Sequence, residues 1–379
     1  MRRVMLNRQS LETLADIAEH PTLGPSVRDV EVSTNHLLPL DELRTLKPPS
    51  EPFSEKTARR ERSADGQDEG AEEETEEVAE EDIEKEMQQE DERGGEETIN
   101  TREADSDYDY CPHLRGLNEV AYRNAFVDQE ELIRRGDDIK HLTRAMRSLI
   151  NCNTISIMDD NRVWGLRRLK EKIGILPQRC LTFESPKSVE LVRRMLYALF
   201  TALAARAESN TSIKKLKIFS TIENANRISP DMLVKPSSAT LDNIRLNTLP
   251  TLFLTLDPKS PEHNATSVNW AHDLVQFVNR FPELSHVTIQ FEDHDEVSDS
   301  ITGTHQINHA ANTRFSKLSQ LLSIPKLEIV KLGSFNCTSM ELALFLLRHQ
   351  NTLKDIHLGS IYLADADGEI GGWLWLIEG

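Results

Sequence analysis

One spacing of apolar residues returns along the chain and limits how it can fold. Its clearest copy is Leu353–Leu363, which reads L-x-x-I-x-L-x-x-I-x-L. Shorter copies with the same first three apolar positions occur at Val27-Val30-Val32, Cys152-Ile155-Ile157, Ile213-Leu216-Ile218, Leu241-Ile244-Leu246, Leu284-Val287-Ile289 and Leu327-Val330-Leu332. A unit this short cannot bury its apolar face alone, so we expect the copies to stack against one another.

This spacing is typical of leucine-rich repeats, in which each unit supplies one short strand to a shared sheet. Between the copies lie stretches with helical periodicity, and strands that alternate with helices pair in parallel. The sequence therefore predicts an α/β fold, a leucine-rich-repeat-like solenoid of helix–strand units with a parallel sheet.

The expected helices begin with one at residues 10–20, for which Ser10 is the predicted N-cap. The others are expected at residues 128–149, 188–206, 268–280, 311–322 and 339–349. Further apolar runs at 241–246 and 251–256 are separated by Pro250. An alternative is a compact α/β domain whose sheet is covered on both faces, but its strands would be almost continuously apolar. The strands here alternate, which favours a sheet with one face in water.

The charge distribution divides the chain into three parts. Residues 68–97 contain 17 acidic residues and only two basic ones, Lys85 and Arg93, which accounts for most of the formal net charge of −19. A segment with so few apolar groups cannot offset its chain entropy. We therefore predict a first helix–strand unit at 1–46, a disordered acidic insertion at 47–107 with a Glu-rich part of weak helical preference, and the solenoid at 108–379. Its last unit stops short, so we expect a truncated C-terminus.

The four cysteines are far apart in the sequence and form no C-x-x-C pair, so we expect neither disulfides nor a zinc site. No apolar segment follows Met1-Arg-Arg, and no run of about 18 apolar residues exists to span a membrane. These observations predict a protein of the cytoplasm or nucleus without a membrane partner. The acidic composition gives no support for nucleic-acid binding.

Three stretches carry a resemblance to a known family: residues 10–32, 142–155 and 346–358, the last followed by Trp373. Their order is similar to the region after the F-box in many fungal F-box proteins, and the resemblance covers residues 1–35 and 108–379. It implies a non-catalytic module that recognises substrates for a ubiquitin ligase. An F-box would precede residue 1, and this chain has none. We therefore expect an incomplete or divergent member, for which a Skp1-type adaptor is a doubtful partner.

The residues that flank the central apolar position of each copy share the open face of the predicted sheet. The partner-binding residues predicted on this basis are Lys215, Lys217, Arg245, Thr288, Lys331 and His357. This row is net basic on an acidic protein, and we hypothesise that it receives an acidic or phosphorylated peptide. Residues 68–97 would then compete for the row from within the same chain. The alternative that these are ordinary solvated strand residues stays open.

Catalysis has little support in the sequence, and we expect no catalytic residue, metal ligand or cofactor. The common nucleotide-binding, hydrolase and zinc-protease motifs do not occur. His305 and His309 lack a third ligand, and the carboxylates around His294 are typical of a charged loop. Trp373 and Trp375 are expected in a terminal cap or core, or as a contact at an exposed edge. A second functional hypothesis is an acidic-tract protein that binds basic partners such as histones, with the solenoid as scaffold.

Overall fold

The computed structural model describes residues 1–45, 114, 116–158, 165–177, 185–207, 213–218, 228–234, 248–257, 259–260, 265–266, 269–291 and 314–363. The chain divides into two compact units, residues 1–46 with 116–379 and residues 47–115. All the helices and strands given below belong to the first unit. The predicted acidic insertion at 47–107 lies outside the described residues.

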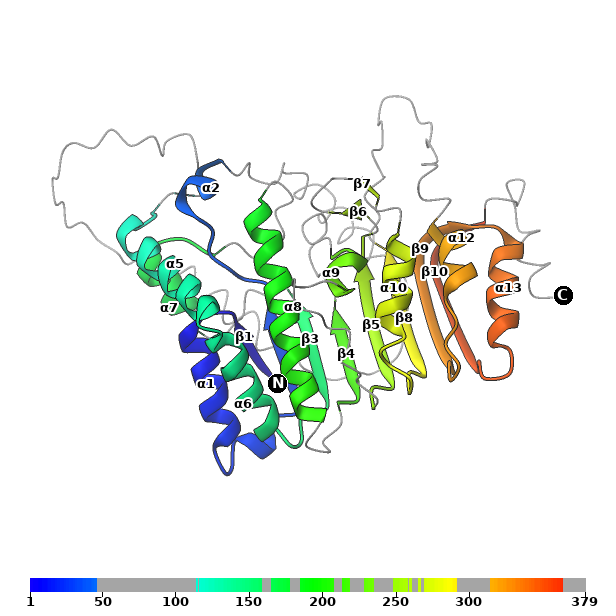
Figure 1. Ribbon diagram of the computed structural model, residues 1–379, viewed down its shortest axis with the longest axis horizontal. Coiled ribbons are helices and arrows are strands. Elements are labelled where there is room, and N and C mark those ends of the chain that lie inside the picture. Colours follow the sequence, from blue (N-terminus) through cyan, green and yellow to red (C-terminus); the bar gives the residue numbers. More distant parts are fainter. Residues whose placement is uncertain are drawn as a thin grey trace, which may run out of the picture. The chain divides into compact units, whose positions relative to one another are not determined.

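Within the described residues, eight parallel strands form one sheet, and their order in the sheet is their order along the chain (Figure 1). The strands are β1 (Arg2–Met5), β2 (Asp29–Ser33), β3 (Thr154–Met158), β4 (Lys215–Ile218), β5 (Thr251–Leu256), β8 (His286–Phe291), β9 (Ile329–Cys337) and β10 (Asp355–Leu363). A separate antiparallel pair is formed by β6 (Lys259–Ser260) and β7 (Ala265–Thr266). The α/β class with a parallel sheet is therefore confirmed.

The helices connect consecutive strands, as parallel pairing requires. They are α1 (Arg8–Glu19), the 3-10 helix η1 (Gly24–Ser26), α2 (Leu40–Thr45), α5 (Glu119–Arg134), α6 (Asp137–Ser148), α7 (Leu166–Ile173), α8 (Pro186–Ala207), α9 (Pro230–Val234), α10 (Trp270–Val278), α12 (Arg314–Leu321) and α13 (Ser339–His349). Figure 1 shows α6 and α8 side by side over the first strands, and their packing against each other is extensive.

Most of these helices cover the same face of the sheet. Leu14 of α1, Leu142 of α6, Leu274 of α10 and Leu342 of α13 belong to one core cluster with alternate strand residues. Successive strand residues point to opposite faces, so this cluster marks a single side, which we call the helical face. The opposite side is called the open face.

Helix α7 is an exception to this arrangement. Its residues Leu166 and Leu169 pack against Met5, whereas the neighbouring Val4 belongs to the main core. Met5 and Val4 point to opposite sides of β1, so α7 covers the open face at the β1 end of the sheet.

The strand register aligns the apolar positions of the repeated copies. One row across the sheet joins Val30, Ile155, Leu216, Leu252, Val287, Val330 and Ile356. The next core row joins Val32, Ile157, Ile218, Leu254, Ile289, Leu332 and Leu358. The predicted copy Leu241-Ile244-Leu246 lies outside the described residues. Its place between β4 and β8 is taken by Leu249-Leu252-Leu254, all three of which are buried.

A backbone hydrogen-bond pattern recurs where the chain enters successive strands. The carbonyl of Arg28 accepts from the amides of Asn153 and Thr154, at 2.7 and 3.2 Å. The same two-donor arrangement runs from Lys214 and Lys215 to Asn153, from Ser285 and His286 to Pro250, from Glu328 and Ile329 to Ser285, and from Lys354 and Asp355 to Glu328. Pro250 occupies a donor position of this pattern but has no N–H, so it serves there only as an acceptor.

Two helix predictions need correction. The single helix expected at 128–149 is two helices, α5 and α6, separated at Gly136, whose φ of 68° breaks the helical path. The N-cap of α1 is Asn7, whose side chain accepts from the Ser10 amide. Ser10 is instead buried inside the first turn, where its hydroxyl accepts from the Met5 amide at 3.1 Å.

Candidate functional site

The open face of the sheet becomes accessible along the strand order. At β2 the open-face residues Glu31 and Ser33 are only 3% and 1% exposed, so the predicted water-exposed face is wrong at that strand. Lys215 of β4, Lys331 of β9 and His357 of β10 are exposed. The candidate interaction surface therefore extends from β4 to β10.

Four of the predicted residues lie in one row across this surface. The register pairs Lys217 with Phe253, Phe253 with Thr288, Thr288 with Lys331, and Lys331 with His357. We call these five residues the central row. Neighbouring strands are about 4.8 Å apart, so the row extends over roughly 19 Å. That length fits a peptide of about six extended residues.

The other two predicted residues have different positions. Lys215 is on the same face in the adjacent row, where it pairs with Thr251. Arg245 lies outside the described residues, and Phe253 occupies the corresponding register position. Phe253 is absent from the predicted row because the copy at Leu249-Leu252-Leu254 crosses Pro250, which has the appearance of a break in the sequence. The signal that would have identified Phe253 is the L-x-x-L-x-L spacing of these leucines.

The described part of this surface from β4 to β9 carries lysines and no carboxylates. Among the described open-face residues of β4, β5, β8 and β9 there is no carboxylate. Lys215 and Lys331 make no ion pair with any described residue, and both are exposed. At the β10 end, His357 Nε2 lies 3.0 Å from Asp355 Oδ2. An anionic group bound near Lys331 would therefore meet positive charge without first displacing a carboxylate.

Beside the central row, two glycines on neighbouring strands carry no side chain. Gly333 of β9 pairs with Gly359 of β10, and a Cβ added at Gly359 would meet nothing within 4 Å. Ser334 follows with a φ of 59°, which shifts the alternation so that Phe335 and Cys337 become the buried positions. A ligand backbone can approach the sheet closely at this glycine pair.

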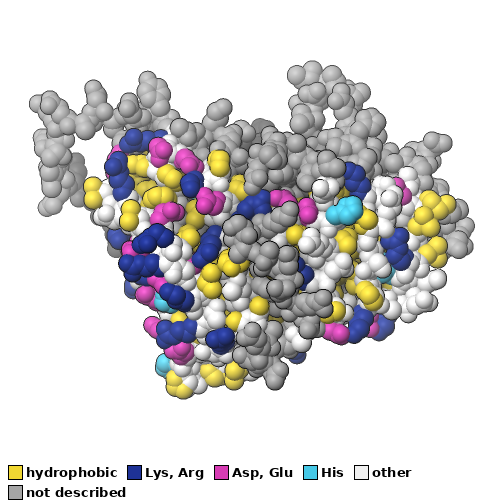
Figure 2. Space-filling view, viewed as in Figure 1, with side chains coloured by type: hydrophobic (Ala, Val, Ile, Leu, Met, Phe, Trp, Pro, Cys, Tyr) yellow, Lys and Arg dark blue, Asp and Glu magenta, His cyan; other side chains and the backbone are white. Residues whose placement is uncertain are grey.

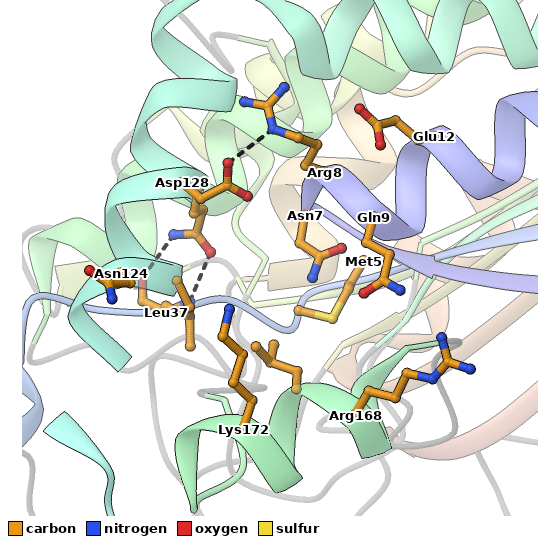
Figure 3. Close-up of a pocket in the computed structure, with 13 residues that line it drawn as sticks. Met5, Asn7, Arg8, Gln9, Glu12, Leu37, Asn124, Asp128, Arg168 and Lys172 are labelled. Atoms are coloured by element: carbon orange, nitrogen blue, oxygen red, sulfur yellow. Dashed lines mark hydrogen bonds and ion pairs between the residues drawn. The ribbon is translucent and has the colours of Figure 1, made fainter. Parts of the chain in front are cut away.

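A cavity of about 350 Å³ lies elsewhere in the unit, where α1, α5 and α7 meet (Figure 3). The guanidinium of Arg8 points toward Asp128 at 2.9 Å and is also 3.5 Å from Asp137. These carboxylates raise the pKa of Arg8, chiefly through the hydrogen bond with Asp128. Arg8 is thus already compensated, and the cavity offers no concentrated charge of one sign.

One wall of this cavity connects α5 to the segment between β2 and α2 through hydrogen bonds. Gln129 accepts from the Leu37 amide at 3.0 Å and donates to the Leu37 carbonyl at 2.9 Å (Figure 3). Tyr122 exchanges hydrogen bonds with Leu38 in the same way, and burial raises its pKa to about 12. Both side chains of α5 therefore satisfy buried backbone, which leaves the central row as the stronger candidate site.

The other predicted chemical features are not brought together. His305, His309, the residues around His294, and Trp373 with Trp375 lie outside the described residues. Within the described part of the chain, no group of three His, Cys, Asp or Glu side chains is placed to hold a metal ion. Cys152 and Cys337 are buried cysteines outside any disulfide bond, and burial raises the pKa of Cys152.

Comparisons with known proteins leave the family open. The sequence matches no model of a protein family, and no curated protein is detectably similar to it. Among the helices that the structure describes, none combines the length and the apolar character needed to cross a bilayer.

Proposed function

We propose that this protein is a non-catalytic recognition module whose first compact unit is a leucine-rich-repeat-like solenoid. Its binding surface is the central row together with Lys215, and its ligand is an acidic or phosphorylated segment of another protein. The role resembles that of the substrate-binding part of an F-box ubiquitin-ligase adaptor. The proposed compartment is the cytoplasm or the nucleus.

Two observations support the solenoid. The apolar positions of the copies align in register on consecutive strands. The two-donor carbonyl pattern recurs at the strand entries. A chain that repeats both its core positions and its junctions builds each unit on the previous one, as repeat proteins do.

The observation that carries the binding proposal is the composition of the central row. Thr288 is at the centre of the row. Lys331 lies beside it on one side, and Phe253 separates it from Lys217 on the other. Phosphate and carboxylate groups form charge-assisted hydrogen bonds with lysine, and an aromatic ring anchors an apolar side chain of the same ligand. The row thus favours a peptide that combines negative charge with at least one apolar residue.

A defined peptide library tests this proposal. Fluorescent peptides that are acidic, singly phosphorylated or neutral would be titrated against the full chain at low and at physiological salt. We expect acidic or phosphorylated peptides to bind, with an affinity that falls as salt rises. The variant Lys215→Glu/Lys331→Glu should lose binding at least tenfold, because two favourable charges become repulsive.

The matched control is Lys170→Glu/Lys317→Glu, which makes the same charge change at exposed lysines of α7 and α12. This control should retain nearly the full affinity. Equal losses in both variants would mean that only net charge matters and would overturn the central row as the site. Repeating the titration after deletion of residues 68–97 tests internal competition, which predicts tighter peptide binding at low salt.

The ligase connection is tested separately. The full chain would be isolated from cells together with its bound proteins, which are then probed for Skp1-type and cullin subunits. Recovery of these subunits supports a role in a ligase. Their absence, with peptide binding intact, would leave a recognition protein that acts outside ubiquitin ligases.

The run of 17 acidic residues at 68–97 favours a second candidate function, the binding of basic partners such as histones. Purified histones should bind the full chain, and deletion of residues 68–97 should abolish this binding. The variant Lys215→Glu/Lys331→Glu should not weaken histone binding. The two candidate functions therefore respond differently to each of the two changes.

A further inference from the structure

The last helix of the described chain has an apolar side with no covering element. Met340, Leu344 and Leu347 of α13 are 53%, 54% and 56% exposed. They are four and three residues apart and so lie on one side of the helix. We call them the terminal stripe. Figure 2 shows hydrophobic side chains gathered at the place where Figure 1 has α13.

Other side chains of α13 contact α12 and the residues that directly follow it. Arg348 donates to the carbonyls of Ser319 and Leu322, and His349 accepts from the Ile324 amide at 3.1 Å. The ring of Phe345 meets that of Phe315 edge to face. The terminal stripe therefore lies where a further helix would pack if the succession continued, since α9, α10, α12 and α13 each contact the helix described before them.

The sheet ends in the same place. β10 is the last strand in the sheet order, so its outer edge is unpaired within the described residues. Ile356 on its helical face is 40% exposed, whereas the equivalent Val287 and Val330 are 1% exposed. An edge strand of nine residues beside a bare apolar helix is a surface that repeat proteins normally close. No other helix in the described ranges has three large apolar side chains this exposed.

The chain supplies a matching segment immediately afterwards. Residues 373–377 read Trp-Leu-Trp-Leu-Ile, five consecutive large apolar residues. The nine residues 364–372 that connect them to β10 reach about 30 Å when extended. The eleven residues of α13 form a helix about 16 Å long, so every part of the terminal stripe is within reach. Gly368, Gly371 and Gly372 allow the chain to reverse direction.

We propose that residues 373–377 pack on the terminal stripe and close the C-terminal end of the repeat unit. A covering segment of the same chain is favoured over a separate partner because it is already tethered at high effective concentration. The inference does not depend on the proposed ligand of the central row.

Tryptophan fluorescence of the full chain tests the proposal. Subtracting the spectrum of Trp373→Phe/Trp375→Phe from that of the unchanged protein isolates the emission of these two indoles. We expect this emission at shorter wavelength than that of tryptophan in water, with little quenching by acrylamide. In Met340→Glu/Leu347→Glu the same difference spectrum should move to longer wavelength, and quenching should rise severalfold.

The matched control is Val120→Glu/Val127→Glu, which introduces the same charges seven residues apart on the exposed side of α5. It should leave the indole emission unchanged. If Met340→Glu/Leu347→Glu fails to fold, as judged by circular dichroism, hydrogen exchange of Trp373→Ser/Trp375→Ser replaces it. That variant should exchange faster than the unchanged protein in α13 and β10.

Two outcomes would overturn the proposal. The first is indole emission typical of water in the unchanged protein, together with α13 exchange that is insensitive to Trp373→Ser/Trp375→Ser. The second is a concentration-dependent dimer, seen by light scattering, that Met340→Glu/Leu347→Glu abolishes while the indoles remain unaffected. The second result would assign the terminal stripe to another copy of the chain.

Discussion

At the scale of single residues, His36 makes two buried polar contacts just after β2. Its Nδ1 lies 2.7 Å from the Thr34 carbonyl, and its Nε2 lies 2.7 Å from the Ser188 hydroxyl at the start of α8. A carbonyl only accepts, so Nδ1 carries the proton and Ser188 donates to Nε2. Burial lowers the pKa of His36 from 6.5 to about 4, although the bond to Thr34 acts in the opposite direction.

Stability should therefore depend on pH through His36. Between pH 6.5 and about 4 the unfolded chain binds a proton at this residue and the folded chain does not. As the pH is lowered from 6.5 to about 4, the free energy of unfolding should fall by about 3 kcal/mol in total. Above pH 6.5 this contribution should be fully present. Urea unfolding at several pH values should show this fall, and His36→Gln should remove it. Parallel pH profiles of the two proteins would contradict the assignment.

At the scale of elements, a buried ion pair joins α6 to α8. The carboxylate of Asp138 has no exposure and accepts from Arg194 Nε at 2.7 Å and Nη2 at 2.8 Å. A similar pair, Arg144 with Glu19, joins α6 to α1 on the surface. The two pairs have the same chemistry and differ mainly in exposure, which makes them a natural comparison.

Removing one partner of the buried pair should be costly. Arg194→Leu leaves the Asp138 carboxylate buried without its counter-charge, and we expect a loss of about 3–5 kcal/mol in the free energy of unfolding. The double variant Asp138→Leu/Arg194→Leu should recover much of that loss. Arg144→Leu is the matched control, and its effect should be far smaller because water screens the surface pair. Denaturant titration gives all three values, and equal losses for Arg144→Leu and Arg194→Leu would contradict this account.

The repeated strands were predictable from sequence because their core positions are apolar at fixed spacing. Val30, Ile155, Val287 and Val330 each lie in the aligned core row as expected. β1 was not predictable, since Arg2–Met5 is short and half polar and, within the described residues, pairs with only one strand, β2. The division between α5 and α6 depends on the left-handed conformation of Gly136, which periodicity does not reveal because both helices place apolar residues at compatible positions.

The candidate site was only partly predictable for the same reason. Lys217, Thr288, Lys331 and His357 follow from alternation within their own strands. The residue between Lys217 and Thr288 depends on which apolar run forms the strand after β4. That run begins directly after Pro250, which in the sequence has the appearance of a break, so Phe253 was not predicted. The burial of Glu31 and Ser33 depends on elements distant in sequence, and a pattern within β2 contains no information about them.

At the scale of the whole first unit, the strand pairings and the packing of the C-terminal helices join successive elements of the same kind. Each interior strand pairs with the strands before and after it, and α10, α12 and α13 pack in sequence. Stability in such an arrangement is approximately a sum of local terms, so disturbance should remain close to its origin.

Two core variants, one near each end of the sheet, test this expectation. Phe345→Ala in α13 removes a fully buried ring and should accelerate amide exchange in α12, α13, β9 and β10 only. Leu142→Ala in α6 should do so in α1, α8, β2 and β3 only. Native-state hydrogen exchange read by mass spectrometry distinguishes these patterns. Uniform acceleration throughout the unit by either variant would indicate one fully cooperative core instead.

The entries of successive strands are connected by main-chain atoms. One carbonyl accepts hydrogen bonds from two amides at the start of the following strand. Any residue with an N–H can occupy the donor positions, and Pro250 demonstrates that even the loss of one donor is accommodated. Side chains at these joins are consequently free to change in evolution without altering the frame. A descendant of this chain can exchange the lysines of the open face for other residues, and so change the chemistry of that surface, while the scaffold beneath it stays the same.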